Sequence, residues 1–201
     1  MTITTPEQLR ELYGWPSGRA KDKVISQLEK HTINFIKKSP FFVLSTYGED
    51  GRADASPRGG KAGFVKLIDD STIIFPDAKG NNIVDSLMNI VDTGRVGCLF
   101  FIPGIDETLR LNGKATISTD PTYIKMFSEE RIPVKSCVIV EIDELFLHCA
   151  KAFMRSKLWT NTYRVERPGF PTLGQMLNDQ LGATGPLESQ EDMVKRYKKN
   201  L

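Results

Sequence analysis

The sequence predicts a mainly β protein of the α+β type, in which a central antiparallel sheet closes into a barrel and helices flank it. Between Phe41 and Phe153, β-branched and aromatic runs alternate with turn residues, and "FFVLSTYGEDG" and "KLIDDSTIIFP" show the hairpin pattern. On either side, apolar residues recur at helical spacing. The chain of 201 residues is expected to form one domain, with N-terminal helices (1–39), the barrel (40–154) and a C-terminal helical extension (155–201).

The composition is that of an ordinary globular protein. Apolar residues make up 40% of the chain, charged residues 26%, and the formal net charge is +2, which gives no reason to expect a nucleic acid or an anionic membrane as partner. No apolar run reaches the roughly 18 residues of a membrane-spanning helix, and the first residues lack the pattern of a secretory leader. We therefore expect a cytoplasmic protein with reduced cysteines, each buried within an apolar run.

The N-terminal region carries start and stop signals for helices. Thr5 is a suitable N-cap, Pro6 fits the first turn and Gly14 follows the end, which predicts a first helix. After the turn "GWPSG", four residues fall on one face of a second expected helix: Val24, Leu28, Thr32 and Phe35.

The remaining elements follow in order. Ile83, Leu87 and Ile90 predict a helix after "DAKGNN", ended by Gly94. The next three strands are expected in "RVGCLFFIPG", "ETLRLNGKATIS" and "SCVIVEIDELFLHCAKAF", with a short helix in "DPTYIKMFSEERIP" before the last. Two short outer helices are expected in "PTLGQMLNDQLG" and "SQEDMVKRYKKN".

Motifs for metal and hydrolytic chemistry are missing from the sequence. Neither His31 nor His148 stands at ligand spacing from Cys, Asp or Glu, so no metal site is expected. The sequence also has no G-x-S-x-G nucleophile elbow and no G-x-x-x-x-G-K-[ST] phosphate loop.

Two stretches have features that suit an anion. In "ASPRGG", Ser56, Arg58 and Gly59 bring a hydroxyl, a guanidinium and accessible backbone amides together at a strand end. In "DAKGNNIVDSL", Asn81 and Asn82 are expected to open a helix whose free N–H groups favour negative charge. Both stretches together could bind one phosphate. Equally, Arg58 could be a solvated edge residue and Asn81 a simple N-cap, and spacing alone leaves both interpretations open.

The stretch from "FFVLSTYGEDG" to "GKATIS" resembles the pyridoxamine 5'-phosphate oxidase-like FMN-binding split-barrel family, and more narrowly a subgroup of probable FMN-dependent enzymes of unassigned substrate. The similarity extends to "LRELYGWPSGRA", "HCAKAFMRSKLW" and "RPGFPTLGQML", and so covers nearly the whole chain. It implies a six-stranded antiparallel split barrel, usually a homodimer, with two FMN molecules bound across the subunit interface.

The resemblance also implies roles for individual residues. Arg58, with Ser56 beside it, matches the family's phosphate-binding arginine, and Phe75 and Pro76 match a strand end that holds the flavin edge. The oxidase's adjacent Arg-Lys phosphate clamp falls on the two asparagines of "KGNN". This departure removes positive charge, so phosphate binding would depend on Arg58, the helix N-terminus, and Lys61 or Lys79.

Thr108 aligns with a flavin-contacting glutamine of the oxidase. By strand alternation Arg110 faces the same way, while Leu109 and Leu111 face the core. Arg110 is then either a candidate to reach the polar edge of the flavin or an ordinary exposed strand residue.

Lys151, Arg155 and Trp159 follow a strand at four-residue spacing and would share one face if the segment is helical. They could cover a flavin held by the partner subunit, with Trp159 shielding the ring. The alternative is an amphipathic turn with Trp159 in an interface core.

These features predict an FMN-dependent oxidoreductase that acts on a small molecule, because a flavin supplies the reactive chemistry and needs few acid or base side chains. A flavin-binding or carrier protein without turnover is the alternative, and a deazaflavin could replace FMN. The family's substrate-phosphate residues have no counterparts, so the substrate stays open. The basic "KRYKKN" is expected to be a solvated chain end and not a nucleic-acid contact.

Overall fold

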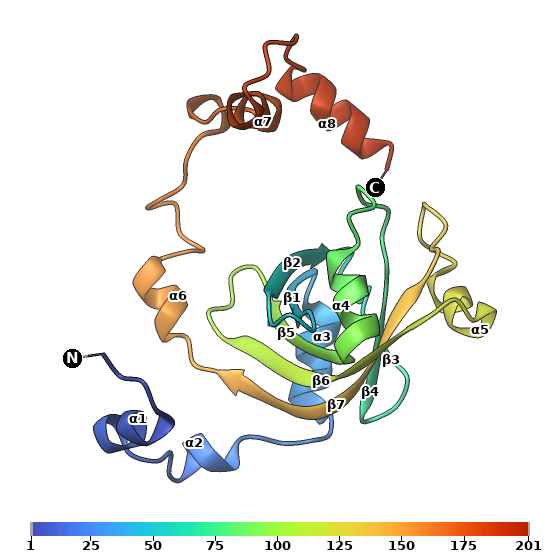
Figure 1. The fold of residues 1–201 in the computed structure, drawn as a ribbon. Helices are drawn as coiled ribbons and strands as arrows, with labels where there is room; N and C mark the ends of the chain where they lie inside the picture. Colours follow the sequence, from blue (N-terminus) through green and yellow to red (C-terminus); the bar gives the residue numbers. More distant parts are fainter. Residues whose placement is uncertain (1, 201) are drawn as a thin grey trace.

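The computed structural model describes residues 2–200 and shows a mainly antiparallel sheet with helices around it (Figure 1). Seven strands pair in the order β2-β1-β5-β6-β7-β4-β3. The strands are β1 (Phe41–Tyr47), β2 (Ala53–Gly59), β3 (Lys66–Leu67), β4 (Thr72–Pro76), β5 (Arg95–Phe101), β6 (Thr108–Ser118) and β7 (Cys137–His148). The two predicted hairpins are confirmed as the β1–β2 and β3–β4 pairs.

The sheet curls around a core, but its ladder of strands is open. The rings of Phe42 on β1 and Phe75 on β4 are 5.0 Å apart between centroids, although three strands separate β1 from β4 in the sheet order. Within residues 2–200, β2 and the two-residue β3 remain unpaired edges. The expected closed barrel of six strands is therefore corrected to a curled, open sheet of seven.

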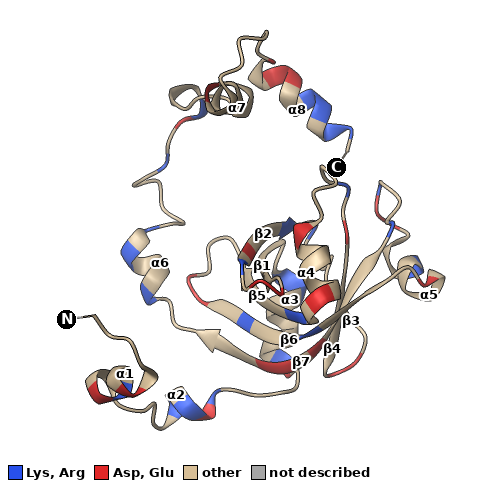
Figure 2. Ribbon diagram, in the orientation of Figure 1, with Lys and Arg blue, Asp and Glu red and all other residues tan. Residues whose placement is uncertain are grey.

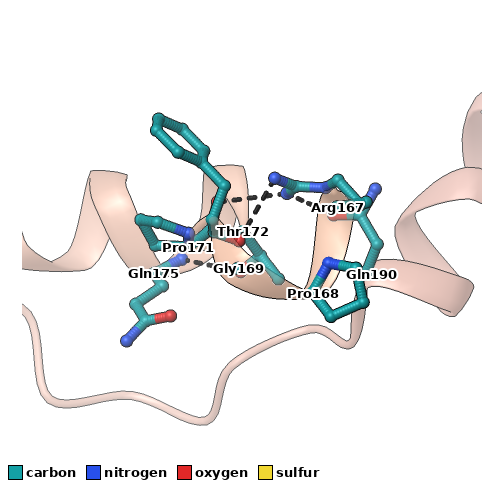
Figure 3. A pocket seen from close by; sticks show the side chains of 8 residues that line it. Arg167, Pro168, Gly169, Pro171, Thr172, Gln175 and Gln190 are labelled. Carbon is teal, nitrogen blue, oxygen red and sulfur yellow. Dashed lines mark hydrogen bonds between the residues drawn. The ribbon is translucent and has the colours of Figure 1, made fainter. Parts of the chain in front are cut away.

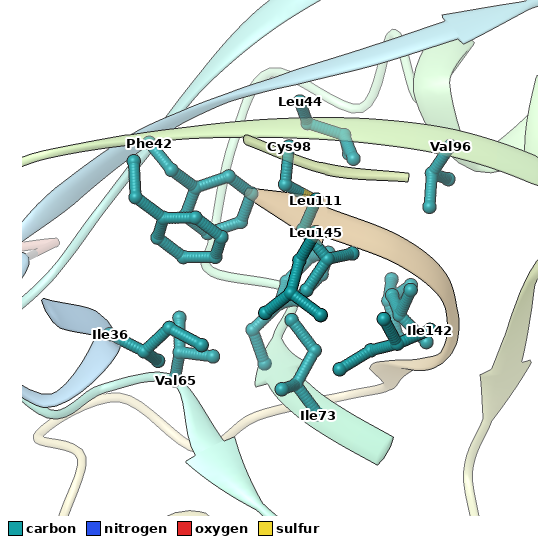
Figure 4. Packing of buried hydrophobic residues seen from close by; sticks show 14 of the residues in the cluster. Ile36, Phe42, Leu44, Val65, Ile73, Val96, Cys98, Leu111, Ile142 and Leu145 are labelled. Carbon is teal, nitrogen blue, oxygen red and sulfur yellow. The ribbon is translucent and has the colours of Figure 1, made fainter. Parts of the chain in front are cut away.

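The core fills the concave side of this sheet (Figure 4). Alternate residues of the central strands point inward, so that Phe42, Leu44, Phe100, Leu109 and Leu111 are fully buried. Each such side chain contributes about 1.5–3 kcal/mol through its removal from water. Burial on one face thus fixes the register, and with it which polar side chains share that face.

At the N-terminus, α1 (Pro6–Tyr13) is confirmed, with a Thr5 capping box and Gly14 at its end. The predicted start of the second helix is wrong. After the short α2 (Arg19–Asp22), the chain stays extended where Ile25 bridges to β7, and α3 (Lys30–Lys38) begins only after the cap Glu29. Backbone pairing with the sheet therefore prevails over the helical spacing of residues 24–29.

Helix α4 (Asp85–Thr93) ends at Gly94, as predicted, but it starts later than expected. Asn81 and Asn82 lie in the preceding loop and do not open the helix. The Asn81 side chain accepts a hydrogen bond from the Ile83 N–H, and Asn82 and Val84 have φ angles of 63° and 54°. Asparagine tolerates this left-handed conformation and favours such turns, so it prolongs the loop.

The short helix expected before the last strand is confirmed as α5 (Pro121–Ile124) with the 3-10 turn η1 (Lys125–Phe127), and the two outer helices as α7 (Leu173–Leu181) and α8 (Gln190–Lys198). The last strand ends earlier than expected, and α6 (Lys151–Ser156) follows it, where the sequence left a helix open. The 3-10 turn η2 (Arg167–Gly169) was not predicted. Cys98 and Cys137 are buried as expected, but Cys149 is exposed. Strand β7 ends at His148, so Cys149 already belongs to the connection that leads out to α6.

The terminal segments stand away from the sheet. In Figure 1 the chain from α6 through α7 to α8 arcs outward and returns near the loop before α4, where the Lys79 ammonium donates to Asn200 at 2.9 Å. No residue described in α1, α2, α6, α7 or α8 is buried. Their exposed apolar side chains include Leu9, Leu12, Tyr13, Leu173, Leu177 and Leu181. No described helix combines the length and apolarity that crossing a membrane requires.

Candidate functional site

One face of β2 is a row of polar side chains. Asp54, Ser56 and Arg58 alternate along the strand and face the same side as Phe42 and Leu44 of β1, with which the row is in register. Because β2 is an edge strand, Pro57 within it costs no ladder hydrogen bond on the open side. The strand therefore places a polar rim at the edge of the core.

Arg58 forms an ion pair across the open side of the curled sheet. Its Nη1 lies 3.2 Å from Oδ1 of Asp77, which directly follows β4, and the two side chains are 19% and 24% exposed. The Arg58 Nε is buried and finds no hydrogen-bond partner among residues 2–200. Because an unpaired buried donor is costly, this nitrogen would gain from an acceptor supplied by a ligand.

A chain of hydrogen bonds connects the rest of the row to α4. The Ser86 hydroxyl lies 2.5 Å from Asp54 Oδ2, Ser56 lies 2.8 Å from Ser86, Thr46 lies 3.3 Å from Asp54, and Asn89 donates to Thr46 at 3.0 Å. A carboxylate only accepts, so the Ser86 proton points to Asp54 and Ser56 must donate to Ser86. The Ser56 hydroxyl proton is thus already used, which leaves Ser56 as an acceptor toward a ligand.

The strand end with Phe75 and Pro76 lies on the same open side as Arg58, since Asp77 follows it directly. Phe75 is fully buried, packed against Phe42 and paired with Val138 of β7, so it presents no surface to a ligand. Pro76 is half-buried.

The remaining residues of the expected phosphate site are exposed. Gly59 ends β2, and Asn81 and Asn82 lie in the loop between β4 and α4. Lys61 is exposed beyond the strand, and Lys79 donates to Asn200. The residues described here thus place one cation, Arg58, on the inner rim itself.

Thr108 and Arg110 lie on the outer face of the sheet. The predicted alternation is confirmed, because Leu109 and Leu111 are fully buried on the opposite side. The Arg110 Nη2 lies 3.0 Å from Glu144 Oε1, and its guanidinium stacks 4.8 Å from the Phe146 ring. Arg110 Nε is also buried without a partner in the described chain.

His148 packs beside this outer cluster. Its ring lies 4.8 Å from that of Phe146, and Lys23 approaches the Phe146 ring at 4.6 Å. Burial lowers the pKa of His148 below the ordinary value of 6.5, and the charges of Lys23 and Arg110 lower it further. Both effects disfavour the charged imidazolium next to the two cations.

Lys151 and Arg155 lie on α6, but Trp159 does not share their helical face. The helix ends at Ser156, and Lys157 adopts a left-handed conformation with φ of 50°. The Trp159 Nε1 donates to the Ile105 carbonyl at 2.9 Å, and its ring stacks 5.5 Å from Phe153. Spacing alone could not show this break in the helix.

The sequence-predicted residues thus form two groups on opposite faces. Ser56, Arg58 and the strand end at Pro76 line the inner rim, whereas Arg110 and the buried Thr108 lie on the other side of the sheet. Helix α6 lies on the outer side too, because Phe153 packs 5.8 Å from Phe101, an outward-facing residue of β5. Within one chain the sheet separates the two groups.

Sequence reasoning missed three residues of the inner rim: Asp54, Ser86 and Asp77. The alternation of polar residues in "DASPR" is a signal that could have identified Asp54 as part of the row. Nothing local marks Asp77 or Ser86, because their partners come from elements distant in sequence.

Other features of the surface do not add to the site. A hollow of about 540 Å³ lies between η2, α7 and α8, where Arg167 donates to two carbonyl groups and to Gln190 (Figure 3). The basic end of α8 follows its own acidic first turn (Figure 2), and Arg196 pairs with Glu188 at 2.6 Å. Among residues 2–200, no three His, Cys, Asp or Glu side chains are grouped so that they could hold a metal ion.

Comparison with known proteins identifies the family. A family model described as pyridoxamine 5'-phosphate oxidase matches residues 28–149. The structure of HupZ from Group A Streptococcus is similar with a TM-score of 0.51 and 18% identity over 60% of this chain and 93% of that chain. A variant of HupZ in which one histidine is replaced by alanine gives the same score and identity over 60% and 98%. These two likenesses concern the fold alone.

A putative pyridoxamine 5'-phosphate oxidase from Lactobacillus delbrueckii has a TM-score of 0.49 and 20% identity over 61% of this chain and 95% of that one. None of the curated proteins compared with the chain matches it. The family model covers more than half of the chain, from Leu28 before α3 to Cys149 after β7. The chain belongs to the pyridoxamine 5'-phosphate oxidase family.

Proposed function

We propose that the protein is an FMN-dependent oxidoreductase that acts on a small molecule and works as a homodimer with flavin bound between the subunits. Family membership supports the flavin-related oxidoreductase class. The observation that carries the proposal is the unpaired Arg58 Nε at the inner rim, where the resemblance expects the FMN phosphate.

The residues of the inner rim fit FMN. Arg58 offers a buried donor for the phosphate, and charge-assisted hydrogen bonds of this kind are the strong ones. Ser56 is left as an acceptor, which suits a hydroxyl of the ribityl chain, and the half-buried Pro76 is the part of the β4 end that could meet the ring edge. When bound, FMN supplies hydride or electron transfer, and the protein's part is to bind, orient and shield it.

The separation of the two residue groups supports a homodimer. Arg58 and Arg110 lie on opposite faces of the sheet, so both can reach one flavin only if they come from two chains. We propose that Arg110 and the α6 residues Lys151 and Arg155, with Trp159 nearby, serve the partner's flavin. The exposed apolar residues of α1 and α7 support the same conclusion, because such surfaces mark interaction sites.

A flavin titration tests the proposal. Replacing Arg58 by alanine is expected to weaken FMN binding by about 10- to 100-fold, the loss of a hydrogen bond to a charged group. Arg52→Ala is the matched control, because Arg52 is exposed at the β1–β2 turn and pairs with Asp50. Fluorescence quenching gives the dissociation constants. The proposal fails if the unchanged protein does not bind FMN.

A second measurement separates an enzyme from a flavin carrier. The flavin-loaded protein is mixed with NADH or NADPH without oxygen, and the flavin absorbance near 450 nm is followed in a stopped-flow instrument for about a minute. Rapid bleaching, and its return with an added acceptor, supports turnover. A loaded protein that neither donor reduces fits the carrier better.

A further inference from the structure

Asp77 places a negative charge at the point where the proposed site needs a positive one. Its carboxylate holds the Arg58 Nη1 at 3.2 Å, and both side chains are mostly shielded from solvent. Asp54 adds a second carboxylate to the same rim, although its Oδ2 receives the Ser86 and Thr46 hydroxyls. The described rim thus carries one guanidinium and two carboxylates.

The loop between β4 and α4 adds no positive charge that would offset the two carboxylates of the rim. Asn81 and Asn82 are uncharged and exposed, and Lys79 donates its hydrogen bond to Asn200. A phosphate that reaches Arg58 therefore meets the Asp77 carboxylate on the same guanidinium. Like charges a few ångströms apart at a partly shielded site repel each other strongly enough to change binding severalfold.

We propose that Asp77 determines how strongly the site binds a phosphorylated flavin: it neutralises Arg58 in the free protein and competes with the phosphate for the guanidinium. This inference rests on the proposed function. Arg58 remains able to bind, because its Nε is unpaired while Nη1 holds Asp77. The consequence is a site that discriminates less between FMN and unphosphorylated riboflavin than the arginine alone would.

A purely structural role for Asp77 makes a different prediction. Asp77 also follows β4 directly, and its N–H donates to the Ser136 carbonyl at 2.9 Å, so the side chain could simply tie the loop to β2. Asparagine keeps an oxygen that accepts from Arg58 but removes the charge. Asp77→Asn therefore separates competition for charge from attachment of the loop.

The experiment measures dissociation constants for FMN and riboflavin with the full chain, the Asp77→Asn variant and a control, Asp50→Asn. Asp50 pairs with Arg52 at the exposed β1–β2 turn, about 20 Å of strand from Arg58, and its replacement changes the net charge equally. We expect Asp77→Asn to bind FMN about tenfold tighter, with riboflavin unchanged and the control unaltered.

The outcomes are distinct. If the unchanged protein binds FMN and Asp77→Asn binds it equally or more weakly, the inference is overturned and the proposed function stands. If Asp77→Asn tightens FMN and riboflavin alike, charge competition is also overturned, because riboflavin has no phosphate. If neither protein binds either flavin, the proposed function fails together with the inference.

Discussion

At the scale of single residues, His148 gives the fold a dependence on pH. Its pKa lies below 6.5 because of burial first, and then because of Lys23 and Arg110. The unfolded chain therefore binds the proton more readily than the folded one, and stability falls as the pH drops from about 7 through the folded-state pKa. We expect His148→Gln to reduce the fall of the unfolding free energy as the pH drops below about 7.

Chemical denaturation at a series of pH values measures this dependence. His31→Gln is the matched control, because His31 is exposed in the first turn of α3 and carries the same imidazole. Equal slopes for His148→Gln and the unchanged protein would contradict a lowered pKa of His148.

The sequence identified Arg58 but not its partner. Arg58 stands out as a cation in a strand that is otherwise small and polar, and the structure places it half-buried on the inner side. Asp77 lies 19 residues further along the chain, and the two meet only because the sheet curls. The donor direction of Ser56 likewise depends on Ser86 and Asp54, which no local pattern brings together.

At the scale of elements, α4 is attached to the sheet through Asp54. Ser86 and Thr46 are each 4% exposed, and both hydroxyls point to this carboxylate. Asp54→Ala leaves them without an acceptor and is expected to lower the unfolding free energy by about 1–3 kcal/mol. Urea denaturation checks this, with Asp50→Ala as the exposed control. A change no larger than that of the control would show that the network does not hold α4.

Capping signals predicted helix ends well where the ends are solvated. Thr5 and Gly14 bound α1 as expected, and Gly94 ends α4. The predicted starts of α3 and α4 were wrong. Before α3 the chain is extended because Ile25 pairs with β7, and before α4 it forms a loop in which Val84 adopts a left-handed conformation. These are tertiary and backbone effects that override periodicity.

At the scale of the whole molecule, the alternation of apolar and polar residues predicted the strands of the sheet. It could not predict whether the sheet closes into a barrel. Whether β2 pairs with another strand depends on edge contacts, and here the side chains of Arg58 and Asp77 approach where no backbone ladder forms. The terminal segments show the same limit. Their amphipathic helices were predicted, whereas their separation from the sheet is a property of the complete fold.

Native mass spectrometry of the purified protein, combined with the mass of any released cofactor, tests the central proposal most directly. We expect an assembly of two chains that carries two FMN molecules, each bound between the inner rim of one chain and the outer residues of its partner. A single chain without flavin, and without uptake of added FMN, would contradict it.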